Sequence, residues 1–215
     1  MKKAVLFDLD GTLLNTLEDL ANAGNHLLST HGYPTYPVDR YRHFVGNGVL
    51  KLVERILPAP QREDPALVAV FKDEFNAYYQ AHKEECTRPY PEIQELLENL
   101  RTRGVRLAVL SNKPDPFTRA LCNRWFPGFF QVVHGQREGL PIKPDPMLPR
   151  QVLQELGVEP QEGLYLGDSG VDMQTARNGG LFALGALWGF RDAPELLENG
   201  ADALLQRPLE LLDYL

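Results

Sequence analysis

The stretch Ala4-Val5-Leu6-Phe7-Asp8-Leu9-Asp10-Gly11-Thr12 decides the fold of this 215-residue chain. Four consecutive apolar residues that end in acidic residues and a glycine are typical of a fully buried β-strand. Four later segments have the same character, at residues 105–110, 131–133, 163–166 and 181–187. Helical patterns lie between them, at residues 91–103, 146–156 and 171–178. Strands that alternate with helices predict an α/β fold, a doubly wound parallel sheet covered on both faces.

Residues 17–84 interrupt this alternation. Apolar residues recur there at helical spacing in three segments, which are residues 17–30, 49–57 and 65–82. No convincing strand pattern separates these segments, so we expect a small helical domain inserted after the first strand. The predicted organisation is an α/β core formed by residues 1–16 and 85–215, with a helical insertion at residues 17–84.

Composition and charge exclude several classes of protein. The formal net charge is −7, whereas proteins that bind nucleic acid usually present a basic surface, so we expect no nucleic-acid partner. No apolar run approaches the roughly 18 residues that span a bilayer, so we expect no membrane partner. Asp8 and Asp10 break the first apolar run too early for an export signal. Cys86 and Cys122 lack metal-type spacing, and we expect reduced thiols in a cytoplasmic protein.

Polar residues follow the predicted strands where each one ends. The first strand ends in Asp8 and Asp10, the second is followed by Ser111 and Asn112, Lys143 comes after the third, and Asp168 and Asp172 follow the fourth. The carboxyl ends of parallel strands meet at one edge of a sheet, where ligands bind. Four carboxylates in one place repel one another unless a divalent cation neutralises them. Oxygen ligands without clustered His or Cys favour Mg²⁺, which also binds phosphate oxygens.

These residues match the motifs of a known family. Asp8-Leu9-Asp10-Gly11-Thr12 matches a DxDGT motif, Ser111 a Ser or Thr at a strand end, Lys143 a single Lys, and Gly167-Asp168 with Asp172 a GDxxxD motif. Each pattern alone is weak, but all four occur in order and each follows a strand. Over essentially its whole length the chain resembles haloacid dehalogenase superfamily phosphatases with a helical cap, and is similar to their phosphoglycolate phosphatase-like members.

The resemblance implies a role for each residue of the core. Asp8 would be the nucleophile and form a phosphoaspartyl intermediate, and Asp10 would be the general acid and base. Ser111, the backbone around Asn112, and Lys143 would bind the transferring phosphoryl group, with Thr12 close to the nucleophile. The alternatives are a turn with helix-capping carboxylates for Asp8 and Asp10, a helix cap for Ser111, and an exposed loop lysine for Lys143.

The implied cofactor is Mg²⁺. Its protein ligands would be Asp168, an oxygen of Asp8 and the backbone carbonyl of Asp10, while Asp172 would hold a metal-bound water. Asp172 could also be a first-turn acid that is stabilised by the helix dipole, and the two roles are compatible.

The helical insertion also contains residues with a possible role in binding. Gly46-Asn47-Gly48 resembles the cap loop of phosphoglycolate phosphatase-like proteins, where backbone N–H groups could approach an anionic substrate; the alternative is a turn between helices. Lys51 and Arg55 share a helix face and could bind a substrate carboxylate, or could lie on a solvated face.

Several functions remain open at this point. The favoured function is hydrolysis of a small phosphate monoester by a monomer or homodimer. A phosphosugar mutase, a pyrophosphatase or a 5′-nucleotidase could use the same core residues. A dehalogenase is disfavoured, because halide displacement does not need the proton-transfer group that Asp10 provides. A phosphonatase is disfavoured, because Asp10 is present and no lysine of the insertion stands out as one that would form an imine. A non-catalytic module that binds a phosphometabolite is also disfavoured, because it would need no nucleophile.

Overall fold

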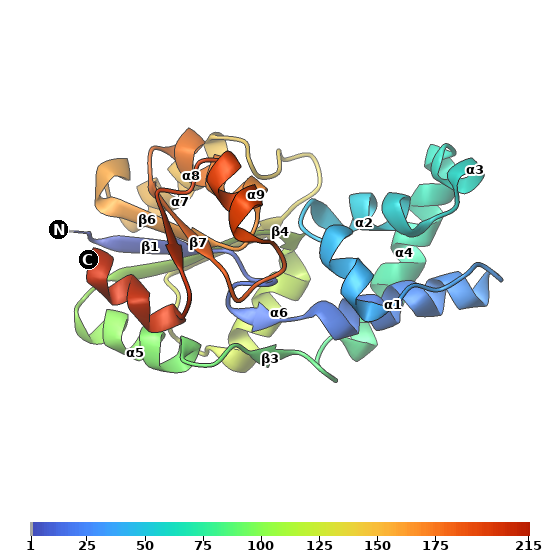
Figure 1. Cartoon of the computed structure of the whole chain (residues 1–215), viewed down its shortest axis with the longest axis horizontal. Coiled ribbons are helices and arrows are strands. Elements are labelled where there is room, and N and C mark those ends of the chain that lie inside the picture. The colour runs from blue at the N-terminus through green and yellow to red at the C-terminus, as the bar shows by residue number, and fades with distance from the viewer. Residues whose placement is uncertain (1) are drawn as a thin grey trace. The chain divides into compact units, whose positions relative to one another are not determined.

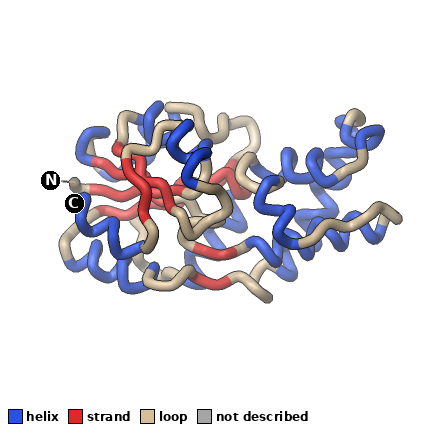
Figure 2. Tube along the Cα trace, in the orientation of Figure 1, coloured by secondary structure: helices blue, strands red, loops and turns tan. Residues whose placement is uncertain are grey.

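Six parallel strands form one sheet in the order β5-β4-β1-β6-β7-β8 (Figures 1 and 2). This computed structural model describes residues 2–215. The strands are β1 (Ala4–Phe7), β4 (Arg106–Pro114), β5 (Val132–Gln136), β6 (Gly163–Gly167), β7 (Phe182–Ala186) and β8 (Ala203–Leu205). The chain runs outward from β1 to β5 on one side and then from β6 to β8 on the other. The predicted doubly wound parallel sheet is therefore confirmed, and the order of the strands reverses beside β1, where such sheets bind ligands.

Side chains of β1 alternate between two apolar layers. Val5 and Phe7 face the layer that contains α5 (Ile93–Thr102), α6 (Asp115–Trp125) and the 3₁₀-helix Pro208–Tyr214. Ala4 and Leu6 face the opposite layer, which contains α7 (Met147–Leu156), α8 (Gly170–Gly179) and α9 (Ala193–Glu198). Figure 1 shows α5 on one side of the sheet and α7 and α8 on the other. Because both faces are covered, all four residues of β1 are fully buried, as their continuous apolar run predicts.

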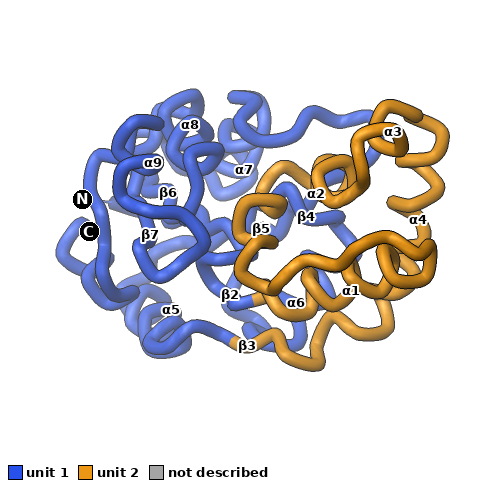
Figure 3. The backbone as a smooth tube through the Cα atoms, turned by 45° about the vertical axis from the view of Figure 1, so that its right-hand side comes forward, with its two compact units in different colours: residues 1–15, 89–215 blue, residues 16–88 orange. Residues whose placement is uncertain are grey.

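The chain divides into two compact units, coloured separately in Figure 3. One comprises Met1–Asn15 and Pro89–Leu215, and the other comprises Thr16–Arg88. The expected helical insertion, residues 17–84, lies within the second unit. Two short strands, β2 (Leu14–Asn15) and β3 (Arg88–Pro89), form a separate two-stranded sheet.

The second unit is helical. Its elements are α1 (Leu17–Thr30), the 3₁₀-helix Val38–His43, α2 (Gly48–Ile56), α3 (Ala59–Arg62) and α4 (Pro65–His82). The predicted helices at residues 17–30 and 65–82 have the expected bounds. Asp64 caps α4 by accepting hydrogen bonds from the backbone N–H groups of Ala66 and Leu67, and Pro65 occupies the first turn. Tyr41 packs against Gly24 inside the unit and donates a hydrogen bond to Asn25 Oδ1.

The structure corrects several predicted element bounds. Helix α5 begins at Ile93 rather than Pro91, because Glu92 has φ +66°, which lies outside the helical region. Strand β4 continues to Pro114 rather than ending at Leu110, and its pairing with β5 shifts register between those residues. Among the elements of the α/β core, α6, α9 and β8 were not predicted from the sequence. Proline in the first turn and the spacing of Phe117, Leu121 and Cys122 were a usable signal for α6.

Of the helices described within residues 2–215, none is both long and apolar enough to cross a bilayer.

Asp19 holds the two ends of the helical unit together. Its carboxylate is 1% exposed and accepts hydrogen bonds from the backbone N–H groups of Cys86 and Thr87 and from the Thr87 hydroxyl, at 2.9, 2.8 and 2.7 Å. Buried donors that lose their acceptor pay their full desolvation cost.

We therefore predict that Asp19→Ala lowers the free energy of unfolding by about 2–4 kcal/mol, since it leaves more than one buried donor without a partner. Urea unfolding followed by circular dichroism measures the change. Asp39→Ala is the control, because the side chain of Asp39 is 89% exposed and should contribute little. Equal stability of the Asp19 variant and the control would contradict this role.

Candidate active site

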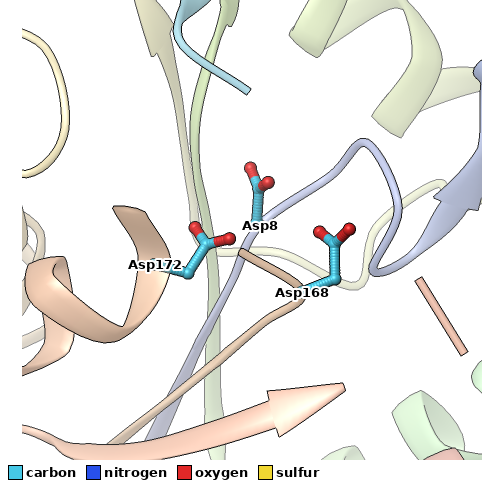
Figure 4. A group of neighbouring side chains, drawn as sticks. All are labelled: Asp8, Asp168 and Asp172. Atoms are coloured by element: carbon cyan, nitrogen blue, oxygen red, sulfur yellow. The ribbon is translucent and has the colours of Figure 1, made fainter. Parts of the chain in front are cut away.

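Three aspartates converge beyond the carboxyl ends of β1 and β6. Asp8 follows β1, Asp168 follows β6, and Asp172 lies in the first turn of α8. A carboxylate oxygen from each lies within 4.8 Å of one from each of the others, and Figure 4 shows the three side chains grouped together. The exposed fractions of the three residues are 8%, 2% and 0%. Adjacent strands and a helix N-terminus thus gather three buried carboxylates, as the sequence predicts for this edge of the sheet.

Lys143 provides the positive charge inside this cluster. Its Nζ lies 2.9 Å from Asp8 Oδ1 and 2.7 Å from Asp172 Oδ1, and it donates to the Tyr165 hydroxyl at 3.0 Å. Lys143 is 2% exposed, so the alternative of an exposed loop lysine is wrong. Tyr165 in turn donates to the carbonyl oxygen of Leu110. The ammonium group therefore joins the nucleophile candidate to the first turn of α8.

The side chain of Asn112 fixes the backbone of Lys143. Asn112 Oδ1 accepts from the Lys143 backbone N–H at 2.8 Å, and Asn112 Nδ2 donates to the Lys143 carbonyl at 3.2 Å. Ser111 is buried at the same strand end, and its hydroxyl accepts from the backbone N–H of Lys113 at 3.3 Å. Ser111 does not cap the next helix, whose N-cap residue is Pro114. Ser111 and Asn112 therefore contribute to the site and do not cap α6.

Two glycines make room for Asp168. Its Oδ1 accepts from the Thr12 hydroxyl at 3.1 Å, and its Oδ2 accepts from the backbone N–H of Phe190 at 2.7 Å. A Cβ at Gly11 or at Gly189 would collide with the Asp168 side chain, and Gly11 also has φ +84°. Only glycine allows the backbone to pass so close on both sides of this carboxylate.

Asp172 uses both of its oxygens within the protein. Its Oδ1 pairs with Lys143, while its Oδ2 accepts from the backbone N–H of Ser169 at 3.1 Å and from the Ser169 hydroxyl at 2.6 Å. Ser169 and Asp172 form a capping box, so Asp172 is indeed a first-turn acid of α8. A Cβ at Gly167 would collide with Asp172, which explains the glycine at that position.

Burial dominates the electrostatics of the cluster. It raises the pKa of Asp8 to about 6; Lys143 opposes this shift, while Asp172 and Asp10 add to it. Burial also raises the pKa of Asp168 well above its ordinary value, with further contributions from Asp172 and Asp8. Burial acts to lower the pKa of Lys143, but the two aspartates beside it outweigh burial and hold the pKa well above its usual range.

The same electrostatics favour a bound cation. One lysine does not neutralise three buried carboxylates, and a divalent cation is the simplest group that would. The cluster contains carboxylates alone, without His or Cys, and such a donor set suits a hard cation. The residues present therefore fit a metal site.

Two contacts near the site were not predicted. The Nζ of Lys113 lies 3.0 and 3.1 Å from the two carboxylate oxygens of Asp10. Trp188 packs against the core and donates from its indole N–H to the carbonyl oxygen of Thr12 at 3.0 Å. A lysine directly after Ser111-Asn112 was a visible signal, but the predicted strand ended too early to draw attention to it.

The predicted binding residues of the insertion lie in the helical unit. Gly46 and Gly48 have φ +116° and +83° and form the turn between the 3₁₀-helix and α2, so the alternative of a turn between helices describes their local structure. Arg55 donates to the carbonyl oxygen of Phe44 at 2.8 Å and to Asn47 Oδ1 at 2.7 Å. Lys51 is exposed and pairs with Glu54 at 2.6 Å. Arg55 thus braces the loop that contains the two glycines.

Comparison with known proteins agrees with this geometry. Residues 5–186 match the family model described as haloacid dehalogenase-like hydrolase. A protein named phosphoglycolate phosphatase from Pseudomonas putida is 36% identical over 95% of this chain and 79% of its own length. Another with the same name, from Aquifex aeolicus, is 32% identical over 98% of this chain and 95% of its own length.

A solved structure extends the comparison to the fold. A crystal structure of a protein from Lactobacillus delbrueckii subsp. bulgaricus has a TM-score of 0.93 and 34% identity, and the match covers 100% of this chain and 98% of that one. The family match includes every core residue discussed above except those after Ala186. The chain is therefore an enzyme of the haloacid dehalogenase-like hydrolase family, similar to the phosphoglycolate phosphatases within it.

Proposed function

We propose that this protein is a Mg²⁺-dependent phosphomonoester hydrolase that acts on phosphoglycolate or a closely similar small phosphorylated acid. The observation that carries the proposal is the buried group of Asp8, Lys143, Asp168 and Asp172 beyond the carboxyl ends of β1 and β6. Lys143 lies 2.9 Å from Asp8 and 2.7 Å from Asp172 in this group. The names of the relatives support the substrate class. No nucleic acid or membrane takes part, and the enzyme is cytoplasmic, as a monomer or a homodimer.

Asp8 is the proposed nucleophile. It attacks the phosphorus atom, the bond to the ester oxygen breaks, and a phosphoaspartyl intermediate forms on Asp8. With its pKa raised to about 6, the Asp8 carboxylate is still mostly ionised near neutral pH, and the adjacent Lys143 favours that form. Lys143, Ser111 and the backbone beside Asn112 stabilise the negative charge on the phosphoryl oxygens. Thr12 helps to hold the site together through its hydrogen bond to Asp168.

Asp10 is the proposed general acid and base. It gives a proton to the leaving oxygen of the ester and then takes one from the water that hydrolyses the phosphoaspartate, which releases inorganic phosphate. General acid–base catalysis of this kind contributes about 10² to 10⁴ in rate. A pure binding module would need neither this group nor the nucleophile.

Mg²⁺ would be held by Asp8, Asp168 and the backbone carbonyl of Asp10. When bound, it would neutralise the carboxylates and the incoming phosphate. Both oxygens of Asp172 already accept hydrogen bonds or pair with Lys143, so Asp172 is not assigned as a direct ligand. It orients Lys143 and, with Mg²⁺ bound, would hold one of the waters of the metal.

The helical unit is the proposed selector of the leaving group. We assign Gly46, Asn47 and Gly48 to recognition of the anionic end of the substrate, with Lys51 and Arg55 as cations that favour a carboxylate. The two hydrogen bonds from Arg55 to this loop support a role in shaping it.

A phosphate-release panel tests the substrate class. We predict that phosphoglycolate has the highest kcat/KM among phosphoglycolate, a hexose phosphate, pyrophosphate and a nucleoside 5′-monophosphate. Release of phosphate is measured with a colorimetric assay, and the hexose phosphate is also checked for isomerisation. A preference for pyrophosphate or the nucleotide, or isomerisation of the hexose phosphate, would show that the proposed substrate class is wrong. The assignment of the nucleophile would not be affected.

Removal of the nucleophile tests the mechanism. Asp8→Asn should lower phosphate release by about four orders of magnitude or more, because loss of a nucleophile removes the covalent route. Asp213→Asn is the matched control, since Asp213 is an exposed aspartate outside the site. If Asp8→Asn keeps more than about a tenth of the activity of the control, Asp8 is not the nucleophile.

Thermal unfolding tests the metal assignment without relying on activity. At about 100 times its dissociation constant, Mg²⁺ should stabilise the wild-type protein by about 2.7 kcal/mol, or about 5–10 °C in Tm. Asp168→Asn should remove this shift and should leave the Tm of the chelated protein unchanged or higher, because one buried like charge is gone. Asp39→Asn should retain the full shift. A full shift in Asp168→Asn would show that Asp168 is not a ligand.

A further inference from the structure

Lys113 and Asp10 form a buried ion pair that the mechanism above does not use. Lys113 Nζ lies 3.0 Å from Asp10 Oδ1 and 3.1 Å from Asp10 Oδ2, so the ammonium group contacts both oxygens of one carboxylate. The side chains are 2% and 12% exposed. The two residues are 103 positions apart in the chain, and the fold alone brings them together.

Sheet register explains how they meet. Strands β1 and β4 are parallel neighbours, with Phe7 paired to Val109. Asp10 lies three residues beyond Phe7, and Lys113 lies four residues beyond Val109, so both lie just past the last paired residues of β1 and β4. Lys113 lies between Leu110 and Pro114, where the pairing of β4 with β5 shifts register, and its ammonium group contacts Asp10 of the DxDGT loop.

The backbone of Lys113 is held on three sides. Its N–H donates to Ser111 Oγ at 3.3 Å, and its carbonyl oxygen accepts from Thr118 Oγ1 at 3.1 Å. A Cβ at Gly135 on β5 would lie 2.6 Å from the same carbonyl oxygen, so the neighbouring strand packs directly against it. Helix α6 begins two residues later, at Asp115. The side chain of Lys113 therefore extends from a backbone that is held in place.

Stability alone does not account for this pair. A buried ion pair contributes little net stability compared with apolar residues of similar size, because both charges must lose their water. What it does provide is a defined orientation, since an ammonium that contacts both oxygens restricts rotation of the carboxylate. Asp8 and Asp10, two residues apart, each have a separate buried lysine, which is Lys143 for the first and Lys113 for the second.

We infer that Lys113 is a positioning residue that orients the Asp10 carboxylate toward the leaving oxygen of the substrate. The inference rests on the proposed function, in which Asp10 is the general acid. A displacement of about 1 Å in a reacting group can lower the rate about 10²-fold, so a carboxylate that rotates freely loses much of its effect.

A series of aryl phosphates tests this inference. The substrates are 4-nitrophenyl, phenyl and 4-methoxyphenyl phosphate, none of which carries a carboxylate, and the leaving phenol becomes a weaker acid along the series. Help from a general acid matters most for the poorest leaving group. We therefore predict that Lys113→Met lowers kcat/KM less than about threefold for the nitrophenyl ester and about tenfold or more for the methoxyphenyl ester. The parameter kcat/KM is used because it is independent of the later hydrolysis of the phosphoaspartate.

Two further variants separate positioning from a structural role. Lys113→Arg retains a cation that can contact both oxygens and should recover most of the lost kcat/KM with the methoxyphenyl ester. Lys83→Met is the matched control: Lys83 is another buried lysine, it lies in the helical unit, and its loss should leave the dependence on leaving group unchanged. In an Asp10→Asn background, Lys113→Met should add less than about twofold, because it acts through Asp10.

The possible outcomes are distinct. The inference would be overturned if Lys113→Met lowered kcat/KM equally for all three esters, or if its effect added fully to that of Asp10→Asn. Lys113 would then have only a structural role. Unchanged activity with all three esters would also overturn it. If the loss of kcat/KM caused by Asp10→Asn is the same for all three esters, the proposed role of Asp10 as general acid is wrong. This result is separate from failure of the Lys113 inference. Thermal unfolding of each variant verifies that the proteins compared are folded.

Discussion

The contact between Lys143 and two buried carboxylates is the interaction on which the rest of the site depends. Removing Asp8 and Asp172 from water is unfavourable, and an ammonium within 3 Å of both offsets that cost. Lys143 can offset this cost only if neighbouring residues hold it in place. Asn112 therefore binds the Lys143 backbone at both its N–H and its carbonyl, and Tyr165 accepts from the ammonium group. The remaining negative charge of the cluster fits a bound cation.

Close backbone approach is the second constraint, and it explains why the motifs are so short and so rich in glycine. Gly11 and Gly189 lie against Asp168, and Gly167 lies against Asp172, so any side chain at these positions would occupy the space of a carboxylate. A parallel sheet makes this possible, since three strand ends can approach one another only where their loops turn away sharply.

Sequence reasoning recovered the parts of this protein that follow from local patterns. The apolar run of β1 and the helical spacing in α4 (Pro65–His82) are strong signals, and both elements have the expected bounds. Bounds that depend on tertiary contacts were wrong. Glu92 keeps φ +66° while its carboxylate accepts from Arg207 and from the Leu209 N–H, which no local pattern reveals. The pairing of Lys113 with Asp10 was missed for the same reason, since it depends on sheet register.

The two lysines suggest why this site needs more than one cation. In the proposed mechanism, Asp8 and Asp10 lie two residues apart on the same loop and carry out different tasks, nucleophile and proton donor, although their chemical groups are identical. The environment has to distinguish them. Lys143 pairs Asp8 with a second aspartate inside the cluster, whereas Lys113 reaches Asp10 from the neighbouring strand and contacts both of its oxygens. Under the proposed mechanism, separate partners would let Asp8 face the phosphorus atom while Asp10 is oriented independently.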